Sequence, residues 1–313
     1  MEFGKTFKQI RKSKRMTLKE AAGDSLSYAQ VSRFENEQSM VTVDVLYEML
    51  SNINTTPQEY YFLMGADPEK ELKDFFYRII ALNGQFDETA ALEAEKEKLL
   101  KRNPGPDDWE RYMVYFIDSI YKIREEEPLA ETFFVRDYLM EVENWGEREL
   151  RIYAMFGFIL PVDTTYFLMK TAVKRSQLYQ GIPQDMKLLH TILTNNFSTF
   201  IYHDRLDYAA EALTIFEKNI SQNPEFVESH LNLLFNKGIY SFKQNKIEKA
   251  KAYCEQVISL CEILRQPERG KMYSNRYQTW LNEHDNPKFK EITIEPGILG
   301  FNLENQEWNP SNH

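Results

Sequence analysis

The side chains best suited to recognition chemistry lie within LSYAQVSRFENEQ, which runs from position 26 to position 38. Ser27 has the hydroxyl of a helix N-cap, so a short helix is expected to start there. Tyr28, Ala29 and Arg33 would then lie on the exposed side of its first turns. An arginine fork can donate two parallel hydrogen bonds, a geometry that fits the O6 and N7 atoms of guanine in the major groove. We therefore predict that Arg33 reads a base and that Tyr28 and Ala29 face base edges.

Two short helices are needed to hold these side chains in place. Val31 and Phe34 form the buried face that anchors the helix just described. The helix before it is TLKEAAG, in which Thr17 and Glu20 have the spacing of a capping box. Gly23 ends this preceding helix. Two short helices joined by a turn that contains glycine predict a helix-turn-helix.

Residues 1–66 contain five helical patterns in all and form the first predicted domain. Phe7 and Ile10 mark the buried face of the first helix, and Val43 begins the fourth. The fifth begins after Thr56, which precedes a proline at the first helical position and a glutamate at the third. This end of the chain is therefore expected to be entirely α-helical.

The order T-L-K-E-A-A, followed after four residues by S-Y-A-Q-V-S-R-F-E-N, resembles the phage-repressor-like (Xre-type) helix-turn-helix family over about residues 4–64. The resemblance implies a five-helix, lambda-repressor-like domain whose third helix enters the major groove. It also implies an ion pair between Arg11 and Glu35. The second helix of that family starts with Thr-Gln, and the glutamine often touches phosphate. Leu18 stands at that position here, so Lys19 is expected to make the contact instead.

Basic residues are concentrated at this end of the chain. Residues 1–33 carry a net charge of +5, whereas the whole chain carries −10 and the remainder therefore −15. A basic head on an acidic body is typical of a unit that binds a polyanion. The residues predicted to bind DNA, with Ser27 and Gln30 near phosphates, are Lys8, Lys14, Arg15, Lys19, Ser27, Tyr28, Ala29, Gln30 and Arg33. The alternative for Lys8, Lys12, Lys14 and Arg15 is an ordinary solvated face, and Arg11 could contact phosphate.

From about Pro68 to Glu283 the apolar residues recur at helical spacing, with breaks at prolines, which predicts a series of helical hairpins. Two segments align turn for turn, DRLDYAAEALTIF and NKIEKAKAYCEQV, with Ala209 and Ala250 as the small packing residues. The stretch LLFNKGIY, with Gly238, resembles the L-G-x-x-Y pattern of tetratricopeptide repeats. The offset of 41 residues between Ala209 and Ala250 is longer than the usual period of these repeats, about 34 residues. Such hairpins stack into a superhelix with a concave inner surface.

A repressor-type head on this body resembles the Rgg family of Gram-positive regulators, which belongs to the peptide-pheromone receptors. The shared features are the opening EFGKTFKQIRKSKRMT, the SRFE of the third helix, and LLFNKGIY followed by IEKAKA. The resemblance implies a cytoplasmic homodimer that binds double-stranded DNA, regulates transcription and is switched by a short imported peptide, as in quorum sensing. The expected organisation is a helix-turn-helix domain at 1–66, a linker at 67–73, a repeat domain for peptide binding and dimerisation at 74–285, and a tail at 286–313.

The peptide site is expected on the concave face of the repeats. An extended peptide has unpaired N–H and C=O groups, and an asparagine amide both donates and accepts. Arginines could bind a terminal carboxylate, and aromatic side chains could form apolar pockets. The candidate residues are Arg148, Arg151, Phe156, Phe158, Arg175, Asn195, Asn196, Tyr202, Asn232, Asn236 and Tyr240. The alternative is that several of these side chains only line contacts between helices.

The sequence has no pattern of an enzyme. Its five histidines form no close pair of metal ligands, and it lacks G-x-S-x-G and P-loop motifs. We expect no cofactor and no metal. No apolar run reaches 18 residues, so we expect no membrane span. Two alternatives stay open: a repeat protein that binds mainly protein partners, and a Rap-like peptide-controlled phosphatase, which would not need the basic head.

Overall fold

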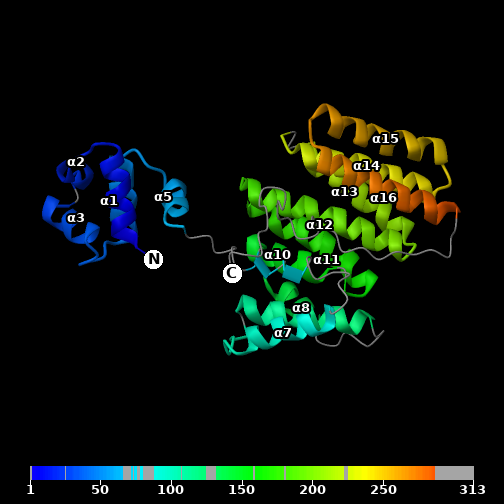
Figure 1. The fold of residues 1–313 in the computed structure, drawn as a ribbon, viewed down its shortest axis with the longest axis horizontal. Helices are drawn as coiled ribbons and strands as arrows, with labels where there is room; N and C mark the ends of the chain where they lie inside the picture. The colour runs from blue at the N-terminus through cyan, green and yellow to red at the C-terminus, as the bar shows by residue number, and fades with distance from the viewer. Residues whose placement is uncertain are drawn as a thin grey trace. The chain divides into compact units, whose positions relative to one another are not determined.

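The computed structural model describes residues 2–24, 26–65, 72, 74–75, 78–79, 88–106, 108–124, 132–157, 159–179, 181–221 and 225–285. The chain divides into two units, Met1–Asp74 and Phe75–His313 (Figure 1). Every regular element within these described ranges is a helix and none is a strand, which confirms the predicted all-α fold. Most of the predicted linker and the whole predicted tail lie outside the described residues.

The described residues 2–65 of the first unit form five helices, as the sequence patterns predict. Three of them begin with a complete capping box, in which the N-cap side chain and the third helical residue each accept a hydrogen bond from the other's backbone N–H. The boxes are Thr17 with Glu20, Ser27 with Gln30, and Thr56 with Glu59. The helices are α1 (Phe3–Ser13), α2 (Leu18–Ala22), α3 (Tyr28–Glu35), α4 (Val43–Asn52) and α5 (Pro57–Leu63).

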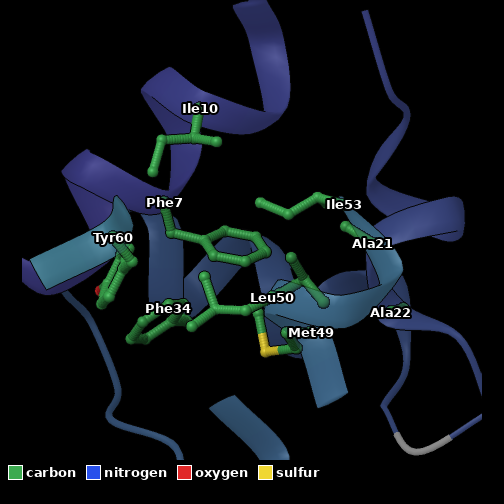
Figure 2. Packing of buried hydrophobic residues seen from close by; sticks show 10 residues of the cluster. Phe7, Ile10, Ala21, Ala22, Phe34, Met49, Leu50, Ile53 and Tyr60 are labelled. Atoms are coloured by element: carbon green, nitrogen blue, oxygen red, sulfur yellow. The ribbon is translucent and has the colours of Figure 1, made fainter. Parts of the chain in front are cut away.

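A small apolar core holds α3 against the rest of this unit (Figure 2). The rings of Phe7 and Phe34 meet edge to face, with their centroids 5.8 Å apart. Val31 is fully buried in the same cluster. Gly4 allows α1 and α3 to approach closely, because a Cβ at this position would lie 1.8 Å from the Phe34 carbonyl oxygen. The position of α3 is therefore fixed by packing on the face opposite to its exposed residues.

The second unit is built from helices that return as hairpins. Two long hairpins join α12 (Pro183–Tyr202) to α13 (Leu206–Ile220) and α14 (Val227–Lys243) to α15 (Ile247–Ile263), and each turn contains a residue with positive φ, Asp204 and Asn245 respectively. Ala209 and Ala250 are fully buried, as expected for the small packing residues of a repeat. Gly238 is required where α14 meets α15, since a Cβ there would lie 2.8 Å from the Cys254 sulfur.

In the second unit α10 (Glu147–Phe156) packs on α12, α12 on α14, and α14 on α16 (Pro267–Asp285), so the first helices of the two hairpins α12–α13 and α14–α15 meet each other (Figure 1). This is the arrangement of helical-repeat proteins, in which the row of first helices lines the inner surface. Among the described helices, none is both long and apolar enough to cross a membrane. The helices of this unit are α7 (Glu88–Leu100), α8 (Trp109–Arg124), α9 (Thr132–Glu141), α10 (Glu147–Phe156), α11 (Val162–Arg175), α12 (Pro183–Tyr202), α13 (Leu206–Ile220), α14 (Val227–Lys243), α15 (Ile247–Ile263) and α16 (Pro267–Asp285).

Candidate functional site

The start of α3 is fixed by a reciprocal capping interaction. The Gln30 backbone N–H donates to Ser27 Oγ over 3.3 Å, and the Ser27 backbone N–H donates to Gln30 Oε1 over 2.9 Å. Both side chains were predicted to lie near phosphates, and that stays a prediction. Within the unit they bond to each other, because the third helical position can reach back to the N-cap. The sequence contained this signal, since Gln is one of the two residue types that complete a capping box.

The first turns of α3 present an uninterrupted exposed face. Tyr28 is 66% exposed, and Ala29 and Arg33 are exposed as well. Val31 and Phe34 on the opposite side are buried, so the helix has the orientation that the sequence predicts. Within the described part of the chain, the Arg33 guanidinium has no bonding partner, which leaves all its donors available to a ligand.

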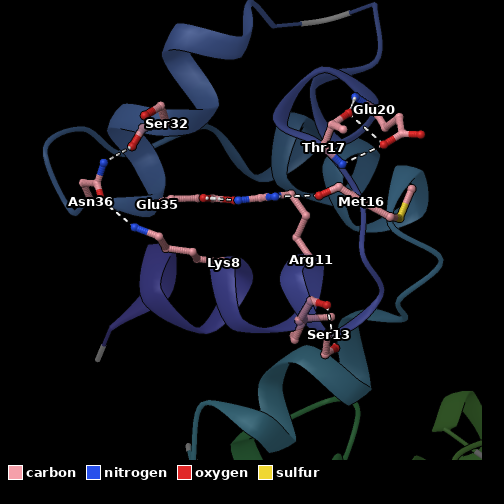
Figure 3. A network of polar contacts seen from close by, with 10 residues as sticks. Lys8, Arg11, Ser13, Met16, Thr17, Glu20, Ser32, Glu35 and Asn36 are labelled. Carbon is pink, nitrogen blue, oxygen red and sulfur yellow. Dashed lines mark hydrogen bonds and ion pairs between the residues drawn. The ribbon is translucent and has the colours of Figure 1, made fainter.

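A buried ion pair ties the end of α3 to α1 (Figure 3). Arg11 Nε donates to Glu35 Oε1 over 2.5 Å, and Arg11 Nη2 donates to Glu35 Oε2 over 2.8 Å. Arg11 Nη1 donates to the Met16 carbonyl oxygen over 2.6 Å. The hydrogen bond to Glu35 raises the pKa of Arg11, although burial acts against it. The expected pair is therefore present, and Arg11, at 8% exposure, is positioned to support the fold rather than to touch phosphate.

Two lysines that were predicted to bind phosphate are engaged within the unit. Lys8 Nζ donates to Asn36 Oδ1 over 2.7 Å, just beyond the end of α3 (Figure 3). Lys14 Nζ donates to Thr55 Oγ1 over 2.7 Å and also to the Asn54 carbonyl oxygen. Lys14 thus donates hydrogen bonds to two oxygen atoms in the turn between α4 and α5. This role depends on residues about forty positions away and could not be predicted from local spacing.

Two other cations predicted to bind DNA, Arg15 and Lys19, remain available for that contact within the described part of the chain. Arg15 and Lys19 are both exposed, and neither has a side-chain partner among the residues that the structure describes. Arg15 follows α1 with a φ of 58° in the left-handed region. Together with Arg33, they form the set of uncommitted cations among the predicted DNA-binding residues.

In the second unit, the three candidate arginines have structural partners. Arg175 Nη1 donates to the carbonyl oxygens of Leu139, Met140 and Val142 over 2.9, 2.9 and 2.5 Å. These carbonyls end α9, so the guanidinium caps that helix. A role of Arg175 in binding a peptide carboxylate is therefore not supported, because its nearest acceptors are already backbone oxygens.

Arg151 and Arg148 are also held by their own unit. Arg151 is 2% exposed, and its Nη2 lies 2.6 Å from Glu147 Oε1 one turn earlier on α10. The Arg148 guanidinium stacks over the Trp109 ring, with its carbon 4.9 Å from the ring centroid. Neither matches the anion-binding role expected of it, since Arg151 already faces a carboxylate and Arg148 an aromatic ring.

The aromatic candidates do not form an open pocket together. Phe156 is fully buried and packs edge to face with Phe116 at 6.2 Å between centroids, so it belongs to the core. Phe158 lies outside the described residues. Tyr202 ends α12 and is 46% exposed. Of the three, Tyr202 alone presents an accessible ring in the described part of the chain.

The asparagines of α12 differ in their surroundings. Asn196 is 2% exposed and donates from Nδ2 to the Tyr153 hydroxyl over 2.8 Å. That hydroxyl donates in turn to the Thr165 carbonyl oxygen over 2.6 Å, and burial raises the pKa of Tyr153. Asn195 is half-buried. Asn196 therefore completes a polar chain between α12, α10 and α11, which is a contact between helices.

The three candidates on α14 share one face of that helix. Asn232 is half-buried, and its Oδ1 accepts from the Tyr273 hydroxyl on α16 over 2.5 Å. Asn236, one turn later, is 1% exposed, and neither atom of its amide has a hydrogen-bond partner among the described residues. Tyr240 follows after another turn and is half-buried. This face of α14 therefore carries an amide, that of Asn236, without a hydrogen-bond partner among the described residues, and α14 packs between α12 and α16.

A buried histidine next to this face was not predicted as a site residue. His190 on α12 is 2% exposed, and its Nδ1 lies 3.0 Å from Ser229 Oγ on α14. Burial lowers the pKa of His190 to about 4, and the nearby His230 adds to the effect. Its place within the apolar stripe of α12 was the available signal that it is buried.

Two family models match this chain. Residues 116–275 match the C-terminal domain of the HTH-type transcriptional regulator Rgg, and residues 7–60 match the helix-turn-helix family. The second match contains α2 and α3, which agrees with the predicted helix-turn-helix.

Solved structures with the same fold cover nearly the whole chain. A putative transcriptional regulator from Listeria monocytogenes EGD-e is 17% identical with a TM-score of 0.74, and the match covers 91% of this chain and 99% of that one. The SHP pheromone receptor Rgg2 of Streptococcus dysgalactiae is 20% identical with a TM-score of 0.68, covering 88% and 98%. PrgX in complex with cCF10 is 13% identical with a TM-score of 0.67, covering 89% and 99%. At these identities the similarity establishes the fold.

Proposed function

Because the chain belongs to the Rgg family of HTH-type transcriptional regulators, we propose that it binds double-stranded DNA sequence-specifically in the cytoplasm and that a short signalling peptide controls this binding. The proposal for DNA is carried by one observation. The first turns of α3 are exposed, while its cap and its buried face fix the helix in place. A rigidly held helix with accessible first turns can enter the major groove. Arg33 is the proposed base reader, because its donors are uncommitted in the described unit and suit guanine.

The proposed phosphate contacts come from the cations without partners. Arg15 and Lys19 are exposed and uncommitted among the described residues. Phosphate contacts position the domain on the duplex without reading sequence. Lys8 and Lys14 contribute less in this proposal, because binding phosphate would require them to give up existing hydrogen bonds.

The peptide is proposed to bind along the inner row of α10, α12, α14 and α16. The related fold of Rgg2 is that of a pheromone receptor, and the fold of PrgX has been solved with cCF10. In this chain the α14 face of Asn232, Asn236 and Tyr240 provides the amides that an extended peptide backbone needs. Control by the peptide can act only as far as the peptide prefers one arrangement of the protein over another.

A homodimer is part of the same proposal. One helix-turn-helix unit covers too little DNA for useful specificity, whereas a two-fold dimer places two recognition helices about 34 Å apart, which matches half-sites one turn apart. The acidic second unit is proposed to supply the contact. Sedimentation of the protein with and without DNA measures this, and a monomer at micromolar concentration under both conditions would contradict it.

The deciding experiment is binding of the purified protein to DNA from upstream of its own gene. Affinity is measured by fluorescence anisotropy over a range of salt, with and without synthetic peptides encoded near the gene. Six to ten neutralised phosphates would make log affinity fall against log salt with a slope of about −0.9 per phosphate. A flat slope would favour a protein-interaction scaffold, the alternative from another functional class. Arg33→Ala serves as the matched variant, since the fold does not depend on its side chain.

A further inference from the structure

Two tyrosines on different helices of the second unit stack on each other. The rings of Tyr166 on α11 and Tyr208 on α13 lie 3.8 Å apart between centroids, with an angle of 6° between their planes. Aromatic pairs in proteins usually have centroids about 4.5–7 Å apart, so these rings are held closer than ring attraction alone usually brings them. Both helices pack on α12, and the stacked rings join them directly to each other.

Each tyrosine hydroxyl bonds to a carboxylate on the other helix. The Tyr208 hydroxyl donates to Asp163 Oδ1 on α11 over 2.7 Å. The Tyr166 hydroxyl donates to Glu211 Oε2 on α13. Hydrogen bonds from Tyr208 and Arg205 hold the pKa of Asp163 below its usual range, so this carboxylate is ionised at neutral pH. The contact is reciprocal, because each helix provides one ring and one acceptor.

A cation lies against each ring. The Arg205 guanidinium carbon is 3.5 Å from the Tyr208 centroid, and Lys170 Nζ is 5.2 Å from the Tyr166 centroid. Both distances are within the range of a cation–π interaction, about 6 Å. The same cations pair with the carboxylates that accept the hydroxyls. Arg205 Nη1 lies 2.7 Å from Asp163 Oδ1, and the Lys170 ammonium lies 3.1 Å from a carboxylate oxygen of α13.

These contacts form one connected network at the start of both helices. Residues three or four apart are neighbours on a helix face, which is the spacing of the members on each helix. We call the network the strap; its members are Asp163, Tyr166 and Lys170 of α11, and Tyr208 and Glu211 of α13 with Arg205 at its N-cap. Isolated ion pairs at the surface contribute little. The strap differs, because every member contacts at least two others and its geometry is therefore over-determined.

We propose that the strap fixes the rotation of α13 relative to α11 and thereby sets the curvature of the helical repeats at this place. The curvature of a repeat protein follows from the small rotation between each repeat and the next, and it shapes the concave surface. The helix that both of them pack on, α12, belongs to the row along which the peptide is proposed to bind. The strap therefore controls the shape of the peptide groove without touching the peptide. Only this last step rests on the proposed function.

The first test measures the distance between two spin labels by electron paramagnetic resonance in the full chain. The labels are attached at Lys174→Cys on α11 and Lys218→Cys on α13, which are exposed positions beyond the strap. The native Cys254 and Cys261 are fully buried, and burial raises the pKa of the Cys254 thiol to about 12, so both stay unlabelled.

The variant that breaks the strap is Tyr166→Phe combined with Tyr208→Phe, which removes both hydroxyls and keeps both rings. Its distance distribution is expected to broaden and its mean to shift. Each single substitution should already give most of this change, because the members act as one unit. Tyr253→Phe on α15 is the matched control, since the cation at its ring, Lys249, belongs to the same helix. A distribution equal to that of the control, or single changes that simply add up, would overturn the inference.

The second test measures fluorescence polarisation of labelled synthetic peptides, one for each short reading frame beside the gene. A peptide that binds the wild-type chain is expected to bind the double phenylalanine variant at least about threefold more weakly, because only part of the population then has the fitting curvature. Unchanged affinity would overturn the role of the strap in peptide binding. Absence of binding to the wild-type chain by every peptide would count against the proposed function itself, and the distance measurement would still decide whether the strap sets the curvature.

Discussion

Removal of Arg11 should destabilise the first unit severely. The substitution Arg11→Ala deletes two hydrogen bonds to Glu35, at 2.5 and 2.8 Å, and a third to the Met16 carbonyl oxygen at 2.6 Å. Glu35 is 2% exposed, so its carboxylate would be left buried and unpaired. Breaking a buried pair in this way costs about 3–5 kcal/mol. A unit of this size is expected to have a total free energy of unfolding of about 3–10 kcal/mol, so a large part of its stability would be lost.

Hydrogen exchange of the full-length protein, read by mass spectrometry, measures the stability of the first unit separately from that of the second. Peptides from residues 1–65 are expected to exchange roughly 200- to 5,000-fold faster in Arg11→Ala, while peptides from residue 88 onward are unchanged. Lys8→Ala is the matched control, because it removes one hydrogen bond from the same helix at a more accessible place and should cost less than about 1 kcal/mol. The double substitution Arg11→Met with Glu35→Leu should recover much of the loss, since no charge is stranded. If Arg11→Ala exchanges no faster than Lys8→Ala, the ion pair adds nothing and the reasoning fails.

Three further predictions concern other parts of the molecule. Arg33→Ala should weaken binding to the preferred DNA by about 1–3 kcal/mol and relax the preference at one base pair, measured by competition with single-base variants; a uniform loss on all DNA would mean that Arg33 contacts phosphate. Lowering the pH from about 7 to 5 should cost about 2 kcal/mol of stability through His190, because its pKa of about 4 in the fold lies below that of the unfolded chain; urea unfolding of His190→Leu should show a weaker pH dependence. Gly238→Ala should lower the Tm of the second unit, since its Cβ would lie 2.8 Å from a cysteine sulfur on α15, whereas Gly181→Ala has open space and should be neutral.

The local patterns of the first unit could be predicted because their causes lie within a few residues. Thr17 with Glu20, and Thr56 with Glu59, are capping boxes in which each partner is three positions from the other. The apolar spacing of α3 likewise specifies which side is buried. Lys14 could not be predicted, because its acceptors lie in a turn that folding brings to the end of α1. Charge type and spacing establish that a lysine is available, whereas its partner is set by tertiary structure.

In the second unit, too, local features could be predicted and tertiary contacts could not. The apolar periodicity predicted the hairpins and their small packing residues, but it did not predict the roles of individual polar side chains. Arg175 was a reasonable candidate for an anion, yet it caps α9 because the end of α11 packs beside the last turn of α9. Its acceptors are more than thirty residues away in the sequence, so only the packed structure identifies them.

Asn196 and Asn236 show how far the sequence can go in finding the peptide face. Both were predicted to bind peptide because an asparagine amide can donate and accept a hydrogen bond, and residue type alone does not distinguish them. The structure does, because Asn196 Nδ2 donates to the Tyr153 hydroxyl, whereas neither atom of the Asn236 amide has a partner among the described residues. A satisfied amide stabilises a contact between helices, so Asn196 is the weaker candidate for peptide binding, and this difference can be recognised only once the partners of each buried amide are known.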